Sequence, residues 1–538
     1  MVRPTRARGP AAPPAPRRAW VDRLPWLGAI LAAAAPLWAS RDLPFVDLPQ
    51  HLYVVAVINR IHDPATLFPG MFELRPEPTP YLGYYALVSV LARLVTLEVA
   101  DRLFLTAYVI AFPLSLAFLL RSLGRPAWPA LLAIPFAYGD SLAWGFFNYC
   151  AGLPVAFLGM GLFIRALTAP SGRLRWAIAL ALSLLAGIAL HPVPIGYLAL
   201  AFPLLLMTTR AGGVPAETAG RSWLRPRLPA LAGVLPAALV ALAWALALLT
   251  RPTAVEVGVP HHAWGPIFSG RNLQFETLAV NLDAFPILLA NMMNDGSDRL
   301  GLQVVTGIAL LAFLARAFER PARVAPPPPW GERLRPAALV ALAAACYLAL
   351  PLNIQGYVQY LNPRFSHLVA ALAVGLVPRL GARSARLFPW LALLAALATA
   401  LPLVRGFRAF DREAAPLHVL AAADRPRVMG LMLDFRSRVV HHPVHLHSAA
   451  TLARERGGVP NYCLAGWRQA PIRYRGTPPP TFPSEWRADL FDYNTQGEAY
   501  DHFLGRGVEP DKVFGERLGH ELYLAARAGD YWLVRRRE

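Results

Sequence analysis

The chain has 538 residues, of which 56% are hydrophobic and 16% are charged. Soluble domains carry about 25% charged residues, so this composition argues against a soluble enzyme and favours a protein with many membrane-spanning helices. The net charge of +19 comes almost entirely from arginine, with Lys512 as the only lysine. Because the arginines lie mostly in loops and terminal regions, the charge does not indicate nucleic-acid binding. The three cysteines are far apart and predict neither a metal motif nor a disulfide framework.

Residues 1–23 are basic and rich in proline, which predicts a disordered cytoplasmic tail. The apolar run at 24–40 follows directly. No clear cleavage site of small residues occurs before Arg41, so this run is expected to be an uncleaved first membrane helix and not a secretory signal.

Further apolar runs long enough to cross about 30 Å of hydrocarbon recur along the chain. Arginine-rich loops at 168–175, 210–228, 317–335 and 379–386 are predicted to be cytoplasmic by the positive-inside rule. With these loops inside, about 11 crossings are expected. The candidate spans are 24–40, 79–97, 103–120, 127–143, 150–167, 174–190, 193–209, 229–250, 300–316, 336–352, 366–378 and 387–404.

The alternation of crossings fails between residues 41 and 150. Only two of the three candidates 79–97, 103–120 and 127–143 can cross, so the third must be interfacial or re-entrant. The stretch 127–143 is the weakest because Pro129 and Pro135 interrupt it, but the residues alone leave the choice open.

This topology places several loops and the whole C-terminal region on one non-cytoplasmic face. The loops are 41–78, which is the long first external loop, 138–149, the His191 turn, 251–299 and 353–365. The polar residues that collect on this face are Asp47, His51, Glu73, Asp140, Asn148, His191, His261, His262 and Arg364.

From 405 to 538 the apolar runs shorten to strand length. Strands are expected at 427–434 and as a pair within 521–537 that turns at 528–530. Helices are expected within 445–458 and 497–507. The predicted fold is therefore an α-helical polytopic membrane domain, 24–404, followed by a soluble extracytoplasmic α/β domain, 405–538.

The segment RDLPFVDLPQHLY at 41–53 places a carboxylate and a histidine just after the first membrane helix. If a helix begins at Asp47, His51 lies on the same face one turn later. On these residues alone, Asp47 as a plain helix cap or solvated interface residue is equally acceptable, because Asp and Pro both favour helix starts.

The wider layout resembles a known family. A basic cytoplasmic N-terminus, one helix and an acidic motif at the start of a long external loop are followed by Pro80-Tyr81, Tyr84-Tyr85 and LVSVLARLVTLEVADRLF. This arrangement is similar to bacterial GT-C glycosyltransferases, the protein mannosyltransferase-like and aminoarabinose transferase-like enzymes, best over 24–167. One departure is that the family often has Asp-Glu or Asp-Asp here, whereas Leu48 follows Asp47.

The resemblance implies transfer of a sugar from a polyprenyl-phosphate donor to a lipid, glycan or protein acceptor at the outer face of the bacterial inner membrane. Asp47 is the expected general base, since a carboxylate within reach of the acceptor hydroxyl can take its proton. His51 is expected to orient that carboxylate or to bind donor phosphate, and Asp140 to support it. Arg364 is the expected phosphate ligand, because arginine grips phosphate with a planar fork. Further candidate substrate-binding residues are Asn148, Glu73 and Arg60. Arg60 and Arg75 are alternatives to Arg364 as the phosphate ligand.

Other functions remain open. His261-His262 lacks ligand spacing. HHPVHLH at 441–447 is either a solvated segment leading into a helix or a metal site, so no cofactor is predicted but a divalent metal stays possible. His191-Pro192 is expected to be a plain turn between helices.

A flippase for a lipid-linked saccharide would also need many spans, but no repeat is evident between the halves. A membrane scaffold with an external binding domain is the third alternative.

Overall fold

The computed structural model describes residues 22–75, 79–212, 224–250, 273–319, 330–354, 358–420, 422–467 and 469–537. Nearly all of the predicted N-terminal tail lies outside the described residues, and so do His261 and His262.

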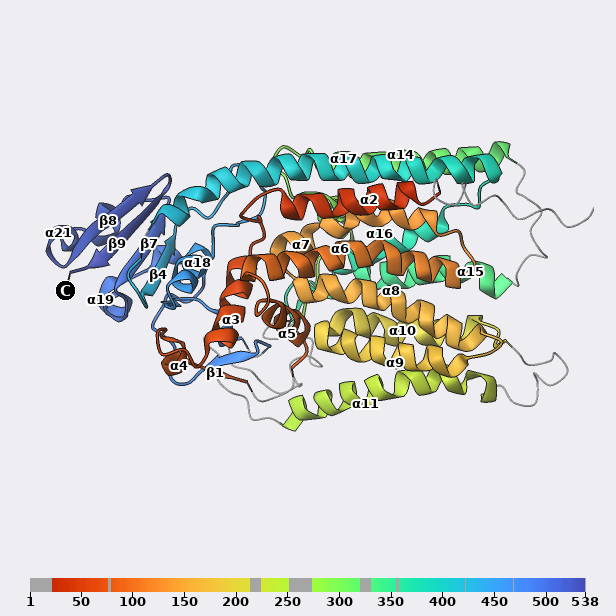
Figure 1. The fold of residues 1–538 in the computed structure, drawn as a ribbon, viewed down its shortest axis with the longest axis horizontal. Helices are drawn as coiled ribbons and strands as arrows, with labels where there is room; N and C mark the ends of the chain where they lie inside the picture. Colours follow the sequence, from red (N-terminus) through yellow and green to blue (C-terminus); the bar gives the residue numbers. More distant parts are fainter. Residues whose placement is uncertain are drawn as a thin grey trace, which may run out of the picture.

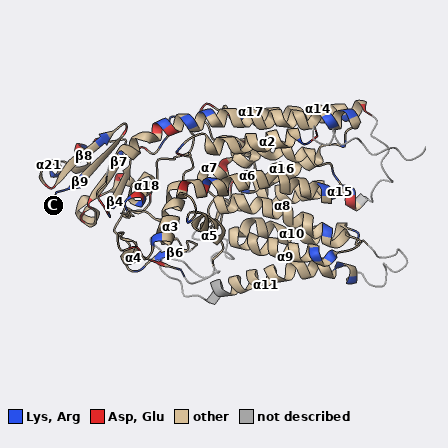
Figure 2. Cartoon of the chain, in the orientation of Figure 1, with Lys and Arg blue, Asp and Glu red and all other residues tan. Residues whose placement is uncertain are grey.

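Long helices lie side by side in one bundle, and a small sheet lies beyond one end of it (Figure 1). Six described helices are long and apolar enough to cross a membrane, and shorter apolar helices accompany them. Charged residues lie mainly at the two ends of the bundle and in the C-terminal region (Figure 2). The prediction of a polytopic α-helical membrane protein is confirmed. The bundle helices are α2 (Leu24–Ala34) with η1 (Ala35–Trp38), α5 (Leu82–Leu91), α6 (Leu97–Ser122), η2 (Trp128–Tyr138), α8 (Phe147–Thr168), α9 (Arg173–Leu190), α10 (Pro192–Thr208), α11 (Leu228–Thr250), α13 (Leu278–Leu289), α14 (Arg299–Phe318), α15 (Trp330–Ala349), α16 (Phe365–Ala373) and α17 (Ala382–Ala414).

Helix length bears on the choice that the sequence left open between 41 and 150. Helix α5, within 79–97, has only 10 residues, about 15 Å at 1.5 Å per residue. By contrast, η2 is an 11-residue 3₁₀ helix whose side chains are all buried, and its length is about 22 Å because a 3₁₀ helix rises more per residue. Both lengths are less than the thickness of the hydrocarbon core, about 30 Å. Of the three candidates, only 103–120, which lies within α6, belongs to the six described helices that are long and apolar enough to cross.

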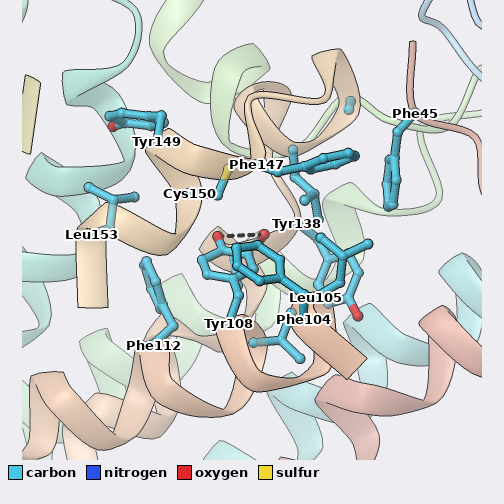
Figure 3. Close-up of a cluster of buried hydrophobic side chains, with 14 of the residues drawn as sticks. Phe45, Phe104, Leu105, Tyr108, Phe112, Tyr138, Phe147, Tyr149, Cys150 and Leu153 are labelled. Carbon is cyan, nitrogen blue, oxygen red and sulfur yellow. Dashed lines mark hydrogen bonds between the residues drawn. The ribbon is translucent and has the colours of Figure 1, made fainter. Parts of the chain in front are cut away.

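A buried aromatic cluster fixes the first loop against the bundle (Figure 3). The ring of Phe45 lies 5.8 Å from that of Phe147 on α8 and 5.8 Å from that of Phe407 on α17. Tyr108 of α6, in the same cluster, donates a hydrogen bond of 3.0 Å to the carbonyl of Ala137. The chain that leads to Asp47 is thus held by large apolar contacts.

Helix α17 continues past residue 404 and ends at Ala414, close to a five-stranded sheet of order β5-β4-β7-β9-β8. Strand β4 is parallel to β5 and β7, and β9 is antiparallel to β7 and β8. The strands are β4 (Arg427–Met432), β5 (Val459–Pro460), β7 (His502–Arg506), β8 (Leu522–Ala528) and β9 (Tyr531–Arg536), with helix α18 (Ser448–Glu455) beside them. The strand at 427–434, the pair at 521–537 and the helix within 445–458 are confirmed.

The predicted helix within 497–507 is wrong. Only a 3₁₀ turn forms at Gly497–Ala499, and strand β7 follows. All five residues of β7 are buried and the strand lies between β4 and β9. A central strand buried on both faces lacks the alternation of a half-exposed strand, so its short apolar run cannot be told from a helix by pattern.

The first loop also carries helix α3 (Leu48–Arg60), helix α4 (Phe68–Met71) and strand β1 (Phe72–Leu74). Strand β1 pairs with β6 (Ile472–Tyr474) of the C-terminal region. The hydroxyl of Tyr53, on α3, donates a 2.8 Å hydrogen bond to the carbonyl of Gly458. The C-terminal region is therefore docked directly on the segment that begins with Asp47.

Candidate functional site

Asp47 is held by the chain that precedes α8. The backbone N–H groups of Val46 and Asp47 donate to the carbonyls of Ala143 and Trp144, at 2.9 and 3.1 Å. Gly145 follows with φ +93°, and a Cβ at this position would lie 2.9 Å from the Cβ of Asp47. Only glycine tolerates both the left-handed backbone and this close approach without strain. The position of Asp47 thus depends on a turn from another part of the chain.

The Asp47 carboxylate does not cap helix α3, although the residue stands at the N-cap position. Its Oδ1 lies 3.3 Å from Nε2 of His447, which immediately precedes α18. The side chain of His447 is 5% exposed, whereas that of Asp47 is 26% exposed. A carboxylate has about four acceptor positions, so this contact leaves Asp47 able to accept from a substrate.

Gln50 fixes the orientation of the His447 ring. Its amide nitrogen donates to the carbonyl of Tyr462 at 3.0 Å, and its amide oxygen accepts from the N–H of Leu464 at 3.3 Å. The amide nitrogen therefore also faces Nδ1 of His447, at 3.2 Å. With Nδ1 accepting, the ring carries its hydrogen on Nε2 and donates it to Asp47. Burial disfavours the charged ring, but the hydrogen bond to Asp47 and the charges of Glu485 and Asp47 raise the pKa of His447.

His51 has different partners from the expected ones. Its Nδ1 lies 2.8 Å from the hydroxyl of Tyr85 and its Nε2 lies 3.0 Å from the carbonyl of Gly145. Burial lowers the pKa of His51 to about 4, even though the charge of Asp47 acts in the opposite direction. His51 is thus a neutral ring that ties α3 to α5 and to the Gly145 turn. The contact with the Asp47 carboxylate that was expected of His51 is made by His447.

The HHPVHLH segment brings a second and a third histidine to carboxylates. Nε2 of His442 lies 2.8 Å from Asp140, in helix α7 (Asp140–Trp144), and Nε2 of His445 lies 3.0 Å from Glu413 near the end of α17. His442, His445 and His447 are all buried, so the prediction of a solvated segment is wrong for them. Among the described residues, no group of three or more His, Cys, Asp or Glu side chains is arranged to hold a metal ion.

Arg364 lies at the same end of the bundle, at the start of α16. The residue is 8% exposed. Its guanidinium donates to the carbonyls of Tyr360 and Gln359 at 3.1 and 3.2 Å, and its Nη1 lies 2.7 Å from Nε2 of His191. It also lies 4.3 Å from the ring centre of Phe146. No carboxylate of the described chain forms an ion pair with it, which is the electrostatic setting of an anion site, because a buried charge is costly without an opposite charge.

Two residues with strained backbone lie close to Arg364. Tyr81 and Tyr360 have φ angles of +87° and +53°, a conformation that is costly for residues other than glycine and often marks functional sites. The side chain of Asn148 holds the first of them, accepting from the N–H of Tyr84 at 2.9 Å and donating to the carbonyl of Tyr81 at 3.0 Å. Asn148 therefore positions Tyr81, whose ring lies 4.8 Å from that of His191.

Two expected substrate-binding residues pair elsewhere. Glu73 binds Arg473 across the β1–β6 pair, with a distance of 2.6 Å. Arg60 binds Asp63 at 3.0 Å. His191 begins α10, as expected of a turn, but it also contacts Arg364. Sequence reasoning missed Gln50, and it missed the contacts of His442 and His447 with carboxylates. The density of histidines in 441–447 was the only sequence signal for the two histidines, and Gln50 had none.

The neutral state of His51 predicts a pH dependence of stability. Its folded pKa is about 4, below the ordinary value of about 6.5, so the folded protein binds fewer protons than the unfolded chain between these values. His51 thus contributes stability above pH 6.5 that is lost as the pH falls towards 4, by about 3 kcal/mol at most. His51→Gln should show a smaller loss of thermal stability between pH 7 and pH 4.5 than the wild type does. The exposed His520→Gln is the control, and equal pH dependence in His51→Gln and wild type would contradict the assignment.

Comparisons with known proteins point in one direction. The chain is similar to ArnT from Cupriavidus metallidurans bound to undecaprenyl phosphate, with a TM-score of 0.53, 12% sequence identity, and coverage of 96% of this chain and 98% of that one. The apo structure of the same ArnT matches with a TM-score of 0.41, 14% identity, and coverage of 97% and 98%. No protein-family model and no curated protein matches the chain. The chain therefore has the fold of the aminoarabinose transferase-like GT-C membrane proteins, as the resemblance in its sequence indicates.

Proposed function

We propose that this protein is a bacterial membrane glycosyltransferase that moves a sugar from a polyprenyl-phosphate donor to a hydroxyl group of a cell-envelope acceptor. The observation that carries the proposal is the placement of a partly exposed carboxylate, Asp47, and a buried guanidinium without a carboxylate partner, Arg364, at the same end of an apolar bundle. The likeness to ArnT solved with undecaprenyl phosphate supports a polyprenyl-phosphate lipid as the donor.

The reaction needs a base at the acceptor and a cation at the leaving group. An oxygen of the Asp47 carboxylate takes the proton of the acceptor hydroxyl while the oxygen of that hydroxyl bonds to the anomeric carbon. The bond between the anomeric carbon and the phosphate oxygen breaks, and its electron pair leaves with polyprenyl phosphate. Negative charge therefore grows on the phosphate, where the fork of Arg364 stabilises it.

The histidine contacts support this assignment of Asp47. His447 donates from Nε2 to the carboxylate, so it fixes the direction of the remaining lone pairs while the acceptor binds. The Asp140–His442 pair forms a second polar contact between the bundle and the C-terminal region, beside the ring of Trp144. In the proposed topology this end of the bundle and the C-terminal domain are extracytoplasmic, and the N-terminus is cytoplasmic.

Asp47→Asn tests the base. The amide cannot accept a proton at neutral pH, so transfer should fall at least about 100-fold while membrane insertion and thermal stability stay close to wild type. The assay is release of undecaprenyl phosphate from a panel of undecaprenyl-phosphate sugars by protein in vesicles, together with lipid extracts as acceptors. The exposed Asp424→Asn is the matched control. Full transfer by Asp47→Asn would remove Asp47 as the base.

His447 variants test whether that ring positions the base. His447→Ala removes the donor to Asp47 and should lower kcat about 10-fold, the effect of losing a hydrogen bond to a charged group. His447→Gln can still donate an N–H and should keep most of the activity, whereas His441→Ala, an exposed neighbour, should match wild type. If Ala and Gln at position 447 are equally active, His447 does not position Asp47.

Arg364 variants test the phosphate site. Arg364→Gln should weaken binding of undecaprenyl phosphate by about 10- to 100-fold, because a charge-assisted pair of hydrogen bonds is lost. Arg364→Lys keeps the charge without the fork and should lie between. Binding is measured by native mass spectrometry of detergent-solubilised protein, with the ion-paired surface residue Arg60→Gln as control. Wild-type affinity in Arg364→Gln would place the lipid phosphate elsewhere.

A further inference from the structure

A separate cavity of about 300 Å³ lies between helix α3, the first turns of α6, the end of α17 and helix α18. Its walls are partly apolar and carry both charge signs. Leu48, Pro49 and Leu52 of α3 line it, whereas Asp47 and His51 do not. Helix α3 therefore separates this cavity from the carboxylate of the proposed reaction.

The carboxylates that line the cavity already have partners. Both oxygens of Asp42 lie within 3.1 Å of Nε2 of His418. Glu98 binds Nη2 of Arg454 at 2.9 Å, and Asp101 accepts a 2.7 Å hydrogen bond from the hydroxyl of Tyr84. Each of these acidic groups thus has a hydrogen-bond or ionic partner within the protein.

The arginines of the lining retain unused donors. Nη2 of Arg102 donates to the carbonyls of Ser40 and Arg41, but its Nε and Nη1 have no partner among the described residues. In the described part of the chain, the guanidinium of Arg41 lies within hydrogen-bond distance of one group, Nδ1 of His418, at 3.3 Å from its Nη2. Both guanidiniums have free N–H groups, and neither forms an ion pair within the described residues, although Asp101 and Glu455 act on them at longer range. Free donors of this kind favour an anion, and phosphate is the anion whose geometry suits two forks.

The surroundings of these arginines are those of a membrane interface. Trp38 and Leu103, each close in sequence to one of them, are 46% and 38% exposed. The indole N–H of Trp38 donates to Thr106 at 3.0 Å, so the ring keeps one polar contact while its apolar part faces outward. Tryptophan is enriched at the level of lipid head groups. An anion bound here has apolar protein surface next to it, as a lipid phosphate requires.

We propose that this cavity binds a phosphate-bearing head group, through Arg41 and Arg102, and that the phosphate belongs to a membrane lipid. The site is distinct from the proposed donor site at Arg364, and it does not depend on the glycosyltransferase assignment. A lipid held here rests against α3, α6, α17 and α18 together, so its binding stabilises the docking of the C-terminal region on the bundle.

The test is lipid binding by the full-length protein in detergent, followed by native mass spectrometry. Phosphatidylglycerol should bind, while diacylglycerol, which has the same tails without phosphate, should not. Arg41→Gln/Arg102→Gln should weaken phosphatidylglycerol binding about 10-fold or more, since charge-assisted hydrogen bonds are lost. Arg93→Gln changes an exposed arginine just before α6 that does not line the cavity, and it should leave phosphatidylglycerol binding unchanged.

The double variant could lose lipid binding through misfolding, because Arg102 also holds the backbone of residues 40 and 41. The single variant Arg41→Gln keeps these backbone contacts and therefore separates the two effects. It should weaken phosphatidylglycerol binding while keeping the thermal unfolding midpoint of the delipidated protein. Equal affinity of the wild type and both variants, or equal binding of diacylglycerol, would overturn the proposal. A competition experiment with inorganic phosphate tests whether the bound anion is a lipid phosphate or free phosphate. If inorganic phosphate binds as tightly as the lipid, the lipid source is overturned, and if millimolar phosphate only displaces the lipid weakly, the lipid source is supported.

Discussion

The docking of the C-terminal region on helix α3 is the constraint on which the candidate site depends. Asp47 begins that helix, and the ring that contacts its carboxylate comes from the HHPVHLH segment at the other end of the chain. The β1–β6 pair and the Tyr53–Gly458 hydrogen bond hold the two parts together. If this docking opened, Asp47 would lose its oriented donor, although the helix itself would remain.

The buried histidines and Arg364 have different kinds of partners at this end of the bundle. The buried histidines at 442, 445 and 447 each contact a carboxylate, so each carboxylate has a hydrogen-bond partner in a poorly solvated place. Arg364 keeps its charge under all ordinary conditions and has only neutral partners in the described chain. The same end of the bundle therefore holds compensated carboxylates and a cation that an anion can still bind.

Rigidity around the site comes from aromatic packing and from backbone strain. Phe45, Phe147 and their neighbours fix the loop before Asp47, and the turn at Gly145 leaves no room for a side chain. The positive φ angles of Tyr81 and Tyr360 persist because Asn148 and Arg364 bond to the same stretches of backbone. Strain of this kind is tolerated where many contacts determine the conformation together.

Local pattern was sufficient for the membrane class and for the strands at 427–434 and 521–537, and the resemblance of the sequence indicated the GT-C fold. Hydropathy, arginine-rich loops and alternation are properties of neighbouring residues, so they survive without knowledge of the fold. The partners of the candidate site residues could not be predicted in this way. Which histidine contacts Asp47, why Glu73 pairs with Arg473, and why 502–506 is a buried strand depend on segments that meet only in the folded C-terminal region and its contact with the first loop. Contacts between segments so far apart in sequence follow from tertiary packing. Secondary-structure propensity and hydrophobic periodicity depend on neighbouring residues only, so they cannot predict such contacts.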